Sequence, residues 1–86
     1  MQDISVTIYG LESVLYKGNV NAITSINEKG KFDILPLHSN FISIVKDYLT
    51  LQLKDGSEKK FKLIQGVLKF TDNEASIFLG LEGLKE

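Results

Sequence analysis

Hydrophobic and polar residues alternate with a period of two along most of this chain. Every second residue from Ile4 to Ile8 is aliphatic, and the same holds from Leu49 to Leu53. Neighbouring side chains of a β-strand point to opposite faces, so this pattern is typical of strands with one buried face. No window keeps the 3.6-residue period of an α-helix over three turns. The pattern therefore predicts an all-β chain.

Turn residues divide the alternating pattern into short segments. The predicted strands are residues 4–9, 14–16, 20–26, 32–34, 41–45, 49–53, 59–64, 67–70 and 75–79. Many short strands separated by regular turn signals are typical of an antiparallel sandwich or barrel, and we expect about 8–10 strands. Gly66 is expected to interrupt the strand around it, because glycine weakens strand interiors.

The Asp55-Gly56 pair gives a strong local hairpin signal. It predicts a tight type I′ turn, because that turn needs positive φ at both central residues. The strands on either side, residues 49–54 and 58–64, should then pair antiparallel. The residues expected to face the core are Leu51, Leu53, Phe61 and Leu63.

Composition and charge narrow the class of protein. The chain has 86 residues, room for one domain over residues 1–86, and a formal net charge of -1. No basic footprint for nucleic acid is present, because Lys59, Lys60 and Lys62 fit the solvated side of a strand. No apolar run approaches the ~18 residues of a membrane span, so we expect no direct membrane insertion. Without cysteine there is no disulfide framework or thiolate metal site.

His38, the single histidine, invites an enzymatic interpretation. Ser39 is its neighbour, and Asp33 and Asp47 are near in sequence, so a hydrolytic triad is one interpretation. Neighbours along an extended chain point to opposite faces, however, which separates His38 from Ser39. One histidine with scattered carboxylates has no recognisable metal-ligand spacing, and the glycines form no phosphate-binding loop. We therefore expect no catalytic residue, metal or cofactor, and a His38 fixed by packing or by a partner.

The segment from Gly30 to His38 resembles a known hallmark. It is similar to Gly-Glu-Phe-Gly-Ile-Leu-Pro-Gly-His of the N-terminal domain of the epsilon subunit of F-type ATP synthases. The matching residues are Gly30, Phe32, Ile34, Leu35, Pro36 and His38. Residues 15–18, 20–26, 41–45 and 61–70 continue the resemblance, which spans residues 4–79. Departures from the family are Lys31 in place of an acid and Asp33, Leu37 and Gln65 in place of glycines.

This resemblance implies a flattened β-sandwich in a non-catalytic subunit of the central stalk. Such a subunit joins the gamma subunit to the polar loops of the c-ring and helps to transmit torque in a proton- or sodium-translocating F-type ATP synthase. It lies peripherally on the cytoplasmic side of the membrane, within the F1 sector. By resemblance, Lys31 and Phe32 contact the c-ring, and the gamma subunit is contacted by His38, Ser39, Phe41 and Ser43.

In the family, the linker to a C-terminal α-helical hairpin would begin near Glu86, where this sequence ends. We expect a short form without the hairpin, either a naturally short subunit or a truncated one. Two alternatives from other classes stay open. One is a small stand-alone β-sandwich module that binds a peptide or a sugar. The other is a small hydrolase centred on His38. Copurification with a gamma subunit would separate the rotor interpretation from both.

Overall fold

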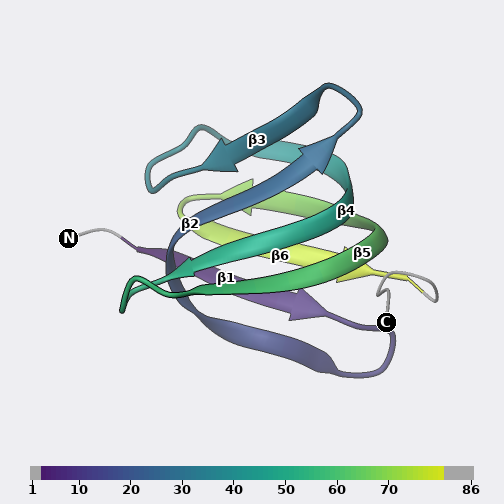
Figure 1. Cartoon of the computed structure of the whole chain (residues 1–86), viewed down its shortest axis with the longest axis horizontal. Helices are drawn as coiled ribbons and strands as arrows, with labels where there is room; N and C mark the ends of the chain where they lie inside the picture. The colour runs from purple at the N-terminus through teal and green to yellow at the C-terminus, as the bar shows by residue number, and fades with distance from the viewer. Residues whose placement is uncertain (1–2, 81–86) are drawn as a thin grey trace.

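The computed structural model describes residues 3–80, which form β-strands joined by turns and contain no helix (Figure 1). The strands are β1 (Ile4–Tyr9), β2 (Val14–Asn27), β3 (Gly30–Ile34), β4 (Phe41–Leu53), β5 (Glu58–Thr71) and β6 (Glu74–Leu79). Their order is β1-β6-β5-β4-β2-β3, and β1 also pairs with β2, which closes the sheet on itself. The β1–β6 pair is parallel and every other pair is antiparallel. The predicted all-β class is confirmed.

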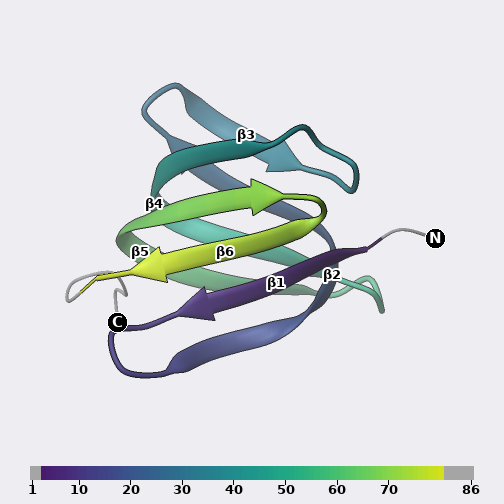
Figure 2. The same ribbon diagram turned by 180° about the vertical axis from the view of Figure 1, so that it is seen from behind.

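The closed sheet is flattened into two layers, which share the long strands β2, β4 and β5. Sheet I, facing the viewer in Figure 2, contains residues 41–46, 65–71, 74–79, 4–9 and 14–20. Sheet II, facing the viewer in Figure 1, contains residues 30–34, 20–27, 46–53 and 58–64. Each long strand therefore starts in one layer and ends in the other.

The strand count differs from the expected 8–10 short strands, although the nine predicted segments are all present. In three places two predicted segments join into one bent strand of 13 or 14 residues. The bends coincide with irregular pairing, between Val20 and Ala22 in β2 and between Lys46 and Asp47 in β4. Asp47 has a φ of 68° there. A β-bulge bends and twists a strand without ending it, which explains the lower count.

The expectation that Gly66 interrupts its strand is wrong. Gly66 is a buried residue inside β5 and pairs with Val45 on one side and Leu79 on the other. A Cβ atom at this position would lie 2.7 Å from Cδ2 of Leu79 and 3.2 Å from the carbonyl oxygen of Phe78. The glycine therefore allows close approach of β5 and β6 where β5 enters sheet I.

The hairpin between β4 and β5 is confirmed, with Leu49 opposite Phe61. Its predicted type I′ turn is wrong, because of the two central residues only Gly56 has positive φ, 91°. The Gly56 N–H donates to the Leu53 carbonyl (3.0 Å), and the Leu53 N–H donates to the Ser57 carbonyl (2.8 Å). These bonds describe a type I turn followed by a left-handed glycine bulge.

The core fills the space between the two sheets. Leu51 and Leu63 are buried, and Leu53 and Phe61 are half-buried side chains packed against the core, as expected. Phe70 heads the fully buried side chains by volume. The fully buried aliphatic residues are Ile4, Ile8, Ile23, Ile34, Leu49, Leu51, Leu68, Ile77, Val6, Val20 and Val45. Both sheets contribute to this list, so a single core holds the layers together.

Candidate functional site

Residues 35–40 cross from sheet II to sheet I and begin with a β-turn around the proline. The His38 N–H donates to the Leu35 carbonyl at 3.1 Å, and Leu37 has a φ of 68°. This is a type II turn with Pro36 at its second position, and the third position, occupied by Leu37, prefers glycine. A left-handed backbone costs a residue with a side chain about 1–2 kcal/mol. Leu37 is nevertheless 72% exposed, so its side chain gains little burial in return.

The rest of this loop is fastened to the end of the sandwich. The Leu37 N–H donates to Oδ1 of Asn73 in the β5–β6 turn, at 2.6 Å. The His38 ring meets the rings of Phe41 and Phe70 edge-on, with centroids 5.7 and 5.9 Å apart. Its Nδ1–H donates to the Ser39 carbonyl at 2.7 Å. These contacts hold the loop in one conformation on the core.

The structure brings three of the expected contact residues together. The rings of Phe32 and Phe41 lie 5.3 Å apart, and His38 touches Phe41, so the three form one aromatic cluster. Phe32 and Phe41 are half-buried and pack against the core. Lys31 and Ser39 are exposed outside this cluster. Two groups of residues assigned to different partners are therefore adjacent in space.

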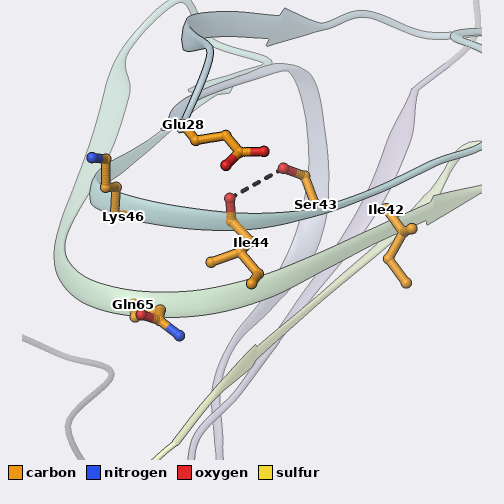
Figure 3. A pocket seen from close by; sticks show the side chains of 6 residues that line it. All are labelled: Glu28, Ile42, Ser43, Ile44, Lys46 and Gln65. Atoms are coloured by element: carbon orange, nitrogen blue, oxygen red, sulfur yellow. Dashed lines mark hydrogen bonds between the residues drawn. The ribbon is translucent and has the colours of Figure 1, made fainter.

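Ser43 lies on β4, away from the loop. Its hydroxyl accepts from Nδ2 of Asn27 at 3.1 Å and lies 3.1 Å from the Ile44 carbonyl, to which it donates. Beside it is a hollow of about 380 Å³ where the β2–β3 turn lies next to β4 and β5 (Figure 3). The hollow is lined by Glu28, Ile42, Ser43, Ile44, Lys46 and Gln65. Ser43 thus belongs to the border between the β2–β3 turn and the outer face of β4.

Sequence reasoning missed the exposed aliphatic residues around this hollow. Ile42 and Ile44 both point outward, while Phe41 and Val45 point toward the core. A strand with one buried face alternates cleanly, whereas residues 41–45 are apolar on both faces. This loss of alternation is the sequence signal that could have predicted the exposed aliphatic residues.

The described residues do not surround His38 with partners for acid–base or metal chemistry. Within residues 3–80 no hydrogen bond or ion pair joins its ring to a carboxylate or hydroxyl, and no three His, Cys, Asp or Glu side chains gather. The β4–β5 turn contains an acid, Asp55, whose pKa its hydrogen bonds alter. There the Ser57 hydroxyl and backbone N–H hold the pKa of Asp55 below its usual value. Within residues 3–80 there is no helix with the length and apolar character needed to cross a bilayer.

Two solved structures have a similar fold. A chain of the Euglena gracilis mitochondrial ATP synthase (OSCP/F1/c-ring) superposes with a TM-score of 0.83 at 17% identity, covering 91% of this chain and 51% of that one. A chain of the Tetrahymena thermophila mitochondrial ATP synthase central stalk/c-ring has a TM-score of 0.69 at 19% identity, covering 90% and 63%. These likenesses concern the fold.

Sequence comparison identifies relatives and a family. The ATP synthase epsilon chain of a Nitratiruptor species is 26% identical over 91 residues, covering 100% of this chain and 70% of the relative. That of Leptospira borgpetersenii serovar Hardjo-bovis is 29% identical over 84 residues, and this chain spans 65% of its length. The family model for the β-sandwich domain of the ATP synthase delta/epsilon chain matches residues 3–79. The chain therefore belongs to the delta/epsilon chain family of ATP synthases and contains its β-sandwich domain.

Proposed function

We propose that this chain is a central-stalk subunit of an F-type ATP synthase, joining the gamma subunit to the c-ring. The observation that carries the proposal is the family match over residues 3–79, together with relatives named ATP synthase epsilon chain. In this role the chain transmits torque and performs no chemistry itself. It works without a cofactor, as a peripheral part of the F1 sector on the cytoplasmic side of the membrane.

The architecture suits a torque-transmitting part. β2, β4 and β5 each run through both layers, so the two sheets are linked by continuous backbone as well as by their shared core. Protein interiors are packed as densely as organic crystals and resist compression. A domain built in this way stores little elastic energy when it is pushed between two rotor parts.

The proposed contacts follow the resemblance residue by residue. His38, Ser39, Phe41 and Ser43 contact the gamma subunit, and Lys31 and Phe32 contact the polar loops of the c-ring. The rigid loop supports this assignment, because residues 37 and 38 are held by hydrogen bonds and ring contacts before any partner arrives. Preorganised contact residues lose less entropy on binding. The exposed Leu37 extends the same surface.

Copurification tests the assignment to the stalk. The chain, coexpressed with the gamma subunit of the same organism, should copurify with it as a stoichiometric complex. The isolated chain should hydrolyse neither ATP nor esters. Esterase or ATPase activity that His38→Ala abolishes would support the hydrolase alternative instead. Saturable binding on a peptide or glycan array, with no gamma complex, would support the stand-alone binding module.

Lys31 tests the c-ring contact, because the family's hallmark has an acid at its position. A rim charge contributes ~0–1 kcal/mol to stability but influences register and partner choice. Lys31→Glu in the assembled enzyme should weaken the coupling of ion flow to ATP synthesis and leave the melting temperature of the domain unchanged. Lys62→Glu, an exposed lysine of β5 in sheet II, is the matched control and should stay coupled. A fully coupled Lys31→Glu enzyme would remove Lys31 from the interface.

A further inference from the structure

The hairpin tip between β4 and β5 carries a chemically reactive pair that the proposed function does not use. Asp55 is followed by Gly56, whereas the other four aspartates are followed by isoleucine, tyrosine or asparagine. No asparagine of the sequence is followed by glycine. The tip projects from the end of the sandwich, and Asp55 is fully exposed there (Figure 1). The sequence therefore has a single Asp-Gly or Asn-Gly step, and water reaches it freely.

An Asp-Gly step can rearrange without an enzyme or a cofactor. The Gly56 backbone nitrogen attacks Cγ of the protonated Asp55 carboxyl, so that a C–N bond forms and a C–O bond breaks. A water molecule leaves with the amide proton, and the product is a succinimide ring. Water then opens the ring at either carbonyl. Opening at Cγ restores aspartate, and opening at the backbone carbonyl gives isoaspartate, in which the chain continues through Cγ.

Gly56 leaves the path to this reaction open. Glycine has no side chain to shield its nitrogen, and a Cβ atom at this position would meet nothing within 4 Å. The φ of Gly56 is 91°, a conformation that favours glycine over residues with a side chain. The turn therefore requires the residue type that makes its own backbone most reactive.

The folded turn opposes the reaction at the attacking nitrogen. The Gly56 N–H donates to the Leu53 carbonyl at 3.0 Å, so the proton that must leave is held in a hydrogen bond. Asp55 is the third residue of the type I turn that this bond closes, where ψ is about 0°. At this ψ the Gly56 nitrogen eclipses the backbone nitrogen of Asp55. Ring closure needs it to eclipse Cβ instead, so the turn must open first.

The turn also opposes the reaction at the carboxyl group. Oδ1 of Asp55 accepts hydrogen bonds from the Ser57 N–H, at 2.9 Å, and from the Ser57 hydroxyl. Hydrogen bonds to a carboxylate favour its ionised form, so they hold the pKa of Asp55 below its usual value. An ionised carboxylate is a poor electrophile, because it has no neutral leaving group. Ser57 therefore keeps the carboxyl group in its unreactive form.

We propose that Asp55-Gly56 is a modification site that the folded turn keeps closed, with isoaspartate as the modification. Leu53 closes it through the Gly56 N–H, and Ser57 closes it through the Asp55 carboxylate. When the hairpin tip opens, the step forms isoaspartate with water as its co-reactant. The modification adds a methylene to the backbone inside a tight turn, so the turn cannot reform with its present hydrogen bonds. The inference does not depend on the proposed rotor role, because it uses only the geometry of this turn.

Incubation of 13C,15N-labelled protein at neutral pH tests the inference, because isoaspartate gives Cα and Cβ cross-peaks distinct from those of aspartate. Isoaspartate should form at residue 55 at least about tenfold faster in urea than in the folded protein, because unfolding removes the hydrogen bonds of the turn. Folded Ser57→Ala should form it at least about threefold faster than the folded wild type, because the hydroxyl bond to the carboxylate is lost.

Two variants serve as controls. Ser13→Ala changes an exposed serine of the β1–β2 turn and should keep the wild-type rate. Asp55→Glu should form no product at this position, because a glutamyl residue closes a larger ring much more slowly. Isoaspartate that persists undiminished in Asp55→Glu would place the modification at another residue and overturn the inference. Equal rates in folded and unfolded wild type, or a Ser57→Ala rate equal to that of the wild type, would overturn it as well.

Hydrogen exchange of the Gly56 amide tests the attacking nitrogen without any substitution. The amide should exchange more slowly in the folded wild type than in the unfolded chain, because the Leu53 carbonyl holds its proton. This measurement stands even where Ser57→Ala fails to fold. An amide that exchanges equally fast in both states would show that the turn does not hold the nitrogen, and the inference would be overturned.

Discussion

The two outer faces of this sandwich differ in chemistry although β2, β4 and β5 run through both sheets. Sheet I carries a row of exposed apolar register partners across its strands, called here the apolar ladder, which consists of Ile44, Val67, Phe78, Tyr9 and Val14. Sheet II carries an equivalent row of register partners, Asp33, Thr24, Thr50 and Lys60. Within that row the Thr24 hydroxyl donates to the Asp33 carboxylate at 2.6 Å. The row on sheet II presents polar and charged side chains to water. The row on sheet I presents apolar side chains to water.

This difference cannot come from the core or from strand propensity. β4 and β5 contribute residues to both rows, and the side chains that they turn inward are apolar in both sheets. Threonine and valine both favour strands, so either would serve for folding alone. The two rows therefore differ in the side chains that they turn outward, although sheet II also exposes one large aliphatic side chain, Ile64, to 48%.

The largest expected effect sharpens the contrast between the inner and outer sides of sheet I. Phe70 is fully buried and supports the His38 ring, whereas Phe78 in the adjacent strand is 47% exposed. Phe70→Ala should cost about 3–5 kcal/mol, because it removes core contacts and leaves a cavity. A small domain has only about 5–15 kcal/mol in total, so the variant should lose a large part of its stability.

Urea denaturation measures this difference, with Phe78→Ala as the matched control. The control should lose much less stability, since half of its ring already faces solvent. Equal losses would mean that Phe78 supports the fold as much as Phe70 does. The outer apolar row of sheet I would then contribute to the stability of the fold as the core does.

The next effect concerns Gly66, where β5 enters sheet I. Gly66→Ala places a methyl group 3.2 Å from the backbone oxygen of Phe78, which cannot move as a side chain can. Overpacking of this kind typically costs about 1–3 kcal/mol. Gly80→Ala is the control, because a Cβ atom there meets nothing within 4 Å. A Gly66→Ala variant with the melting temperature of the wild type would show that β5 and β6 can move apart here without a loss of stability.

The strands could be predicted from sequence because period-two alternation reports directly on one buried face. Their continuity could not be predicted. Asp47 and Gly66 look like ends of strands, yet the core on both sides of each bend keeps the chain extended through it. The type of each turn could not be predicted from the local sequence either. Asp55-Gly56 has the composition of a type I′ turn, but that geometry occurs at Asp72 and Asn73, with φ of 51° and 61°.

In the candidate site, too, some features could be predicted from the local sequence and others could not. His38 was expected to be fixed by packing or by a partner, and its ring packs on Phe41 and Phe70 while the Leu37 N–H hydrogen-bonds Asn73. Its neighbours in space could not be found from spacing alone. Asn73 reaches Leu37 from 36 residues away, and the ladder unites five strands through long-range register. Such relations depend on how the sheet closes.

A smaller effect is expected at Leu37, in the loop that leads from sheet II to sheet I. Leu37→Gly should raise the unfolding free energy by about 1 kcal/mol, because glycine adopts positive φ without steric cost. The same change removes an exposed side chain from the proposed gamma-binding loop, so binding of the gamma subunit should weaken. Thermal denaturation and a binding titration measure the two effects on one variant. A gain in stability with unchanged binding would exclude Leu37 from the interface.

The smallest expected effect lies at the hairpin tip of sheet II. The hydroxyl and the backbone N–H of Ser57 hydrogen-bond the Asp55 carboxylate, which lowers its pKa below the unfolded value of about 3.9. A lowered folded-state pKa means that this stabilisation is complete above the unfolded pKa and is lost as the pH falls through the folded one. Asp55 is fully exposed, so the change in melting temperature between pH 5 and 2 should be slight. An NMR titration of the carboxyl carbon resolves it better. Ser57→Ala should shift the Asp55 midpoint upward toward the unfolded value, and an unmoved midpoint would show that the hydroxyl hydrogen bond does not cause the shift.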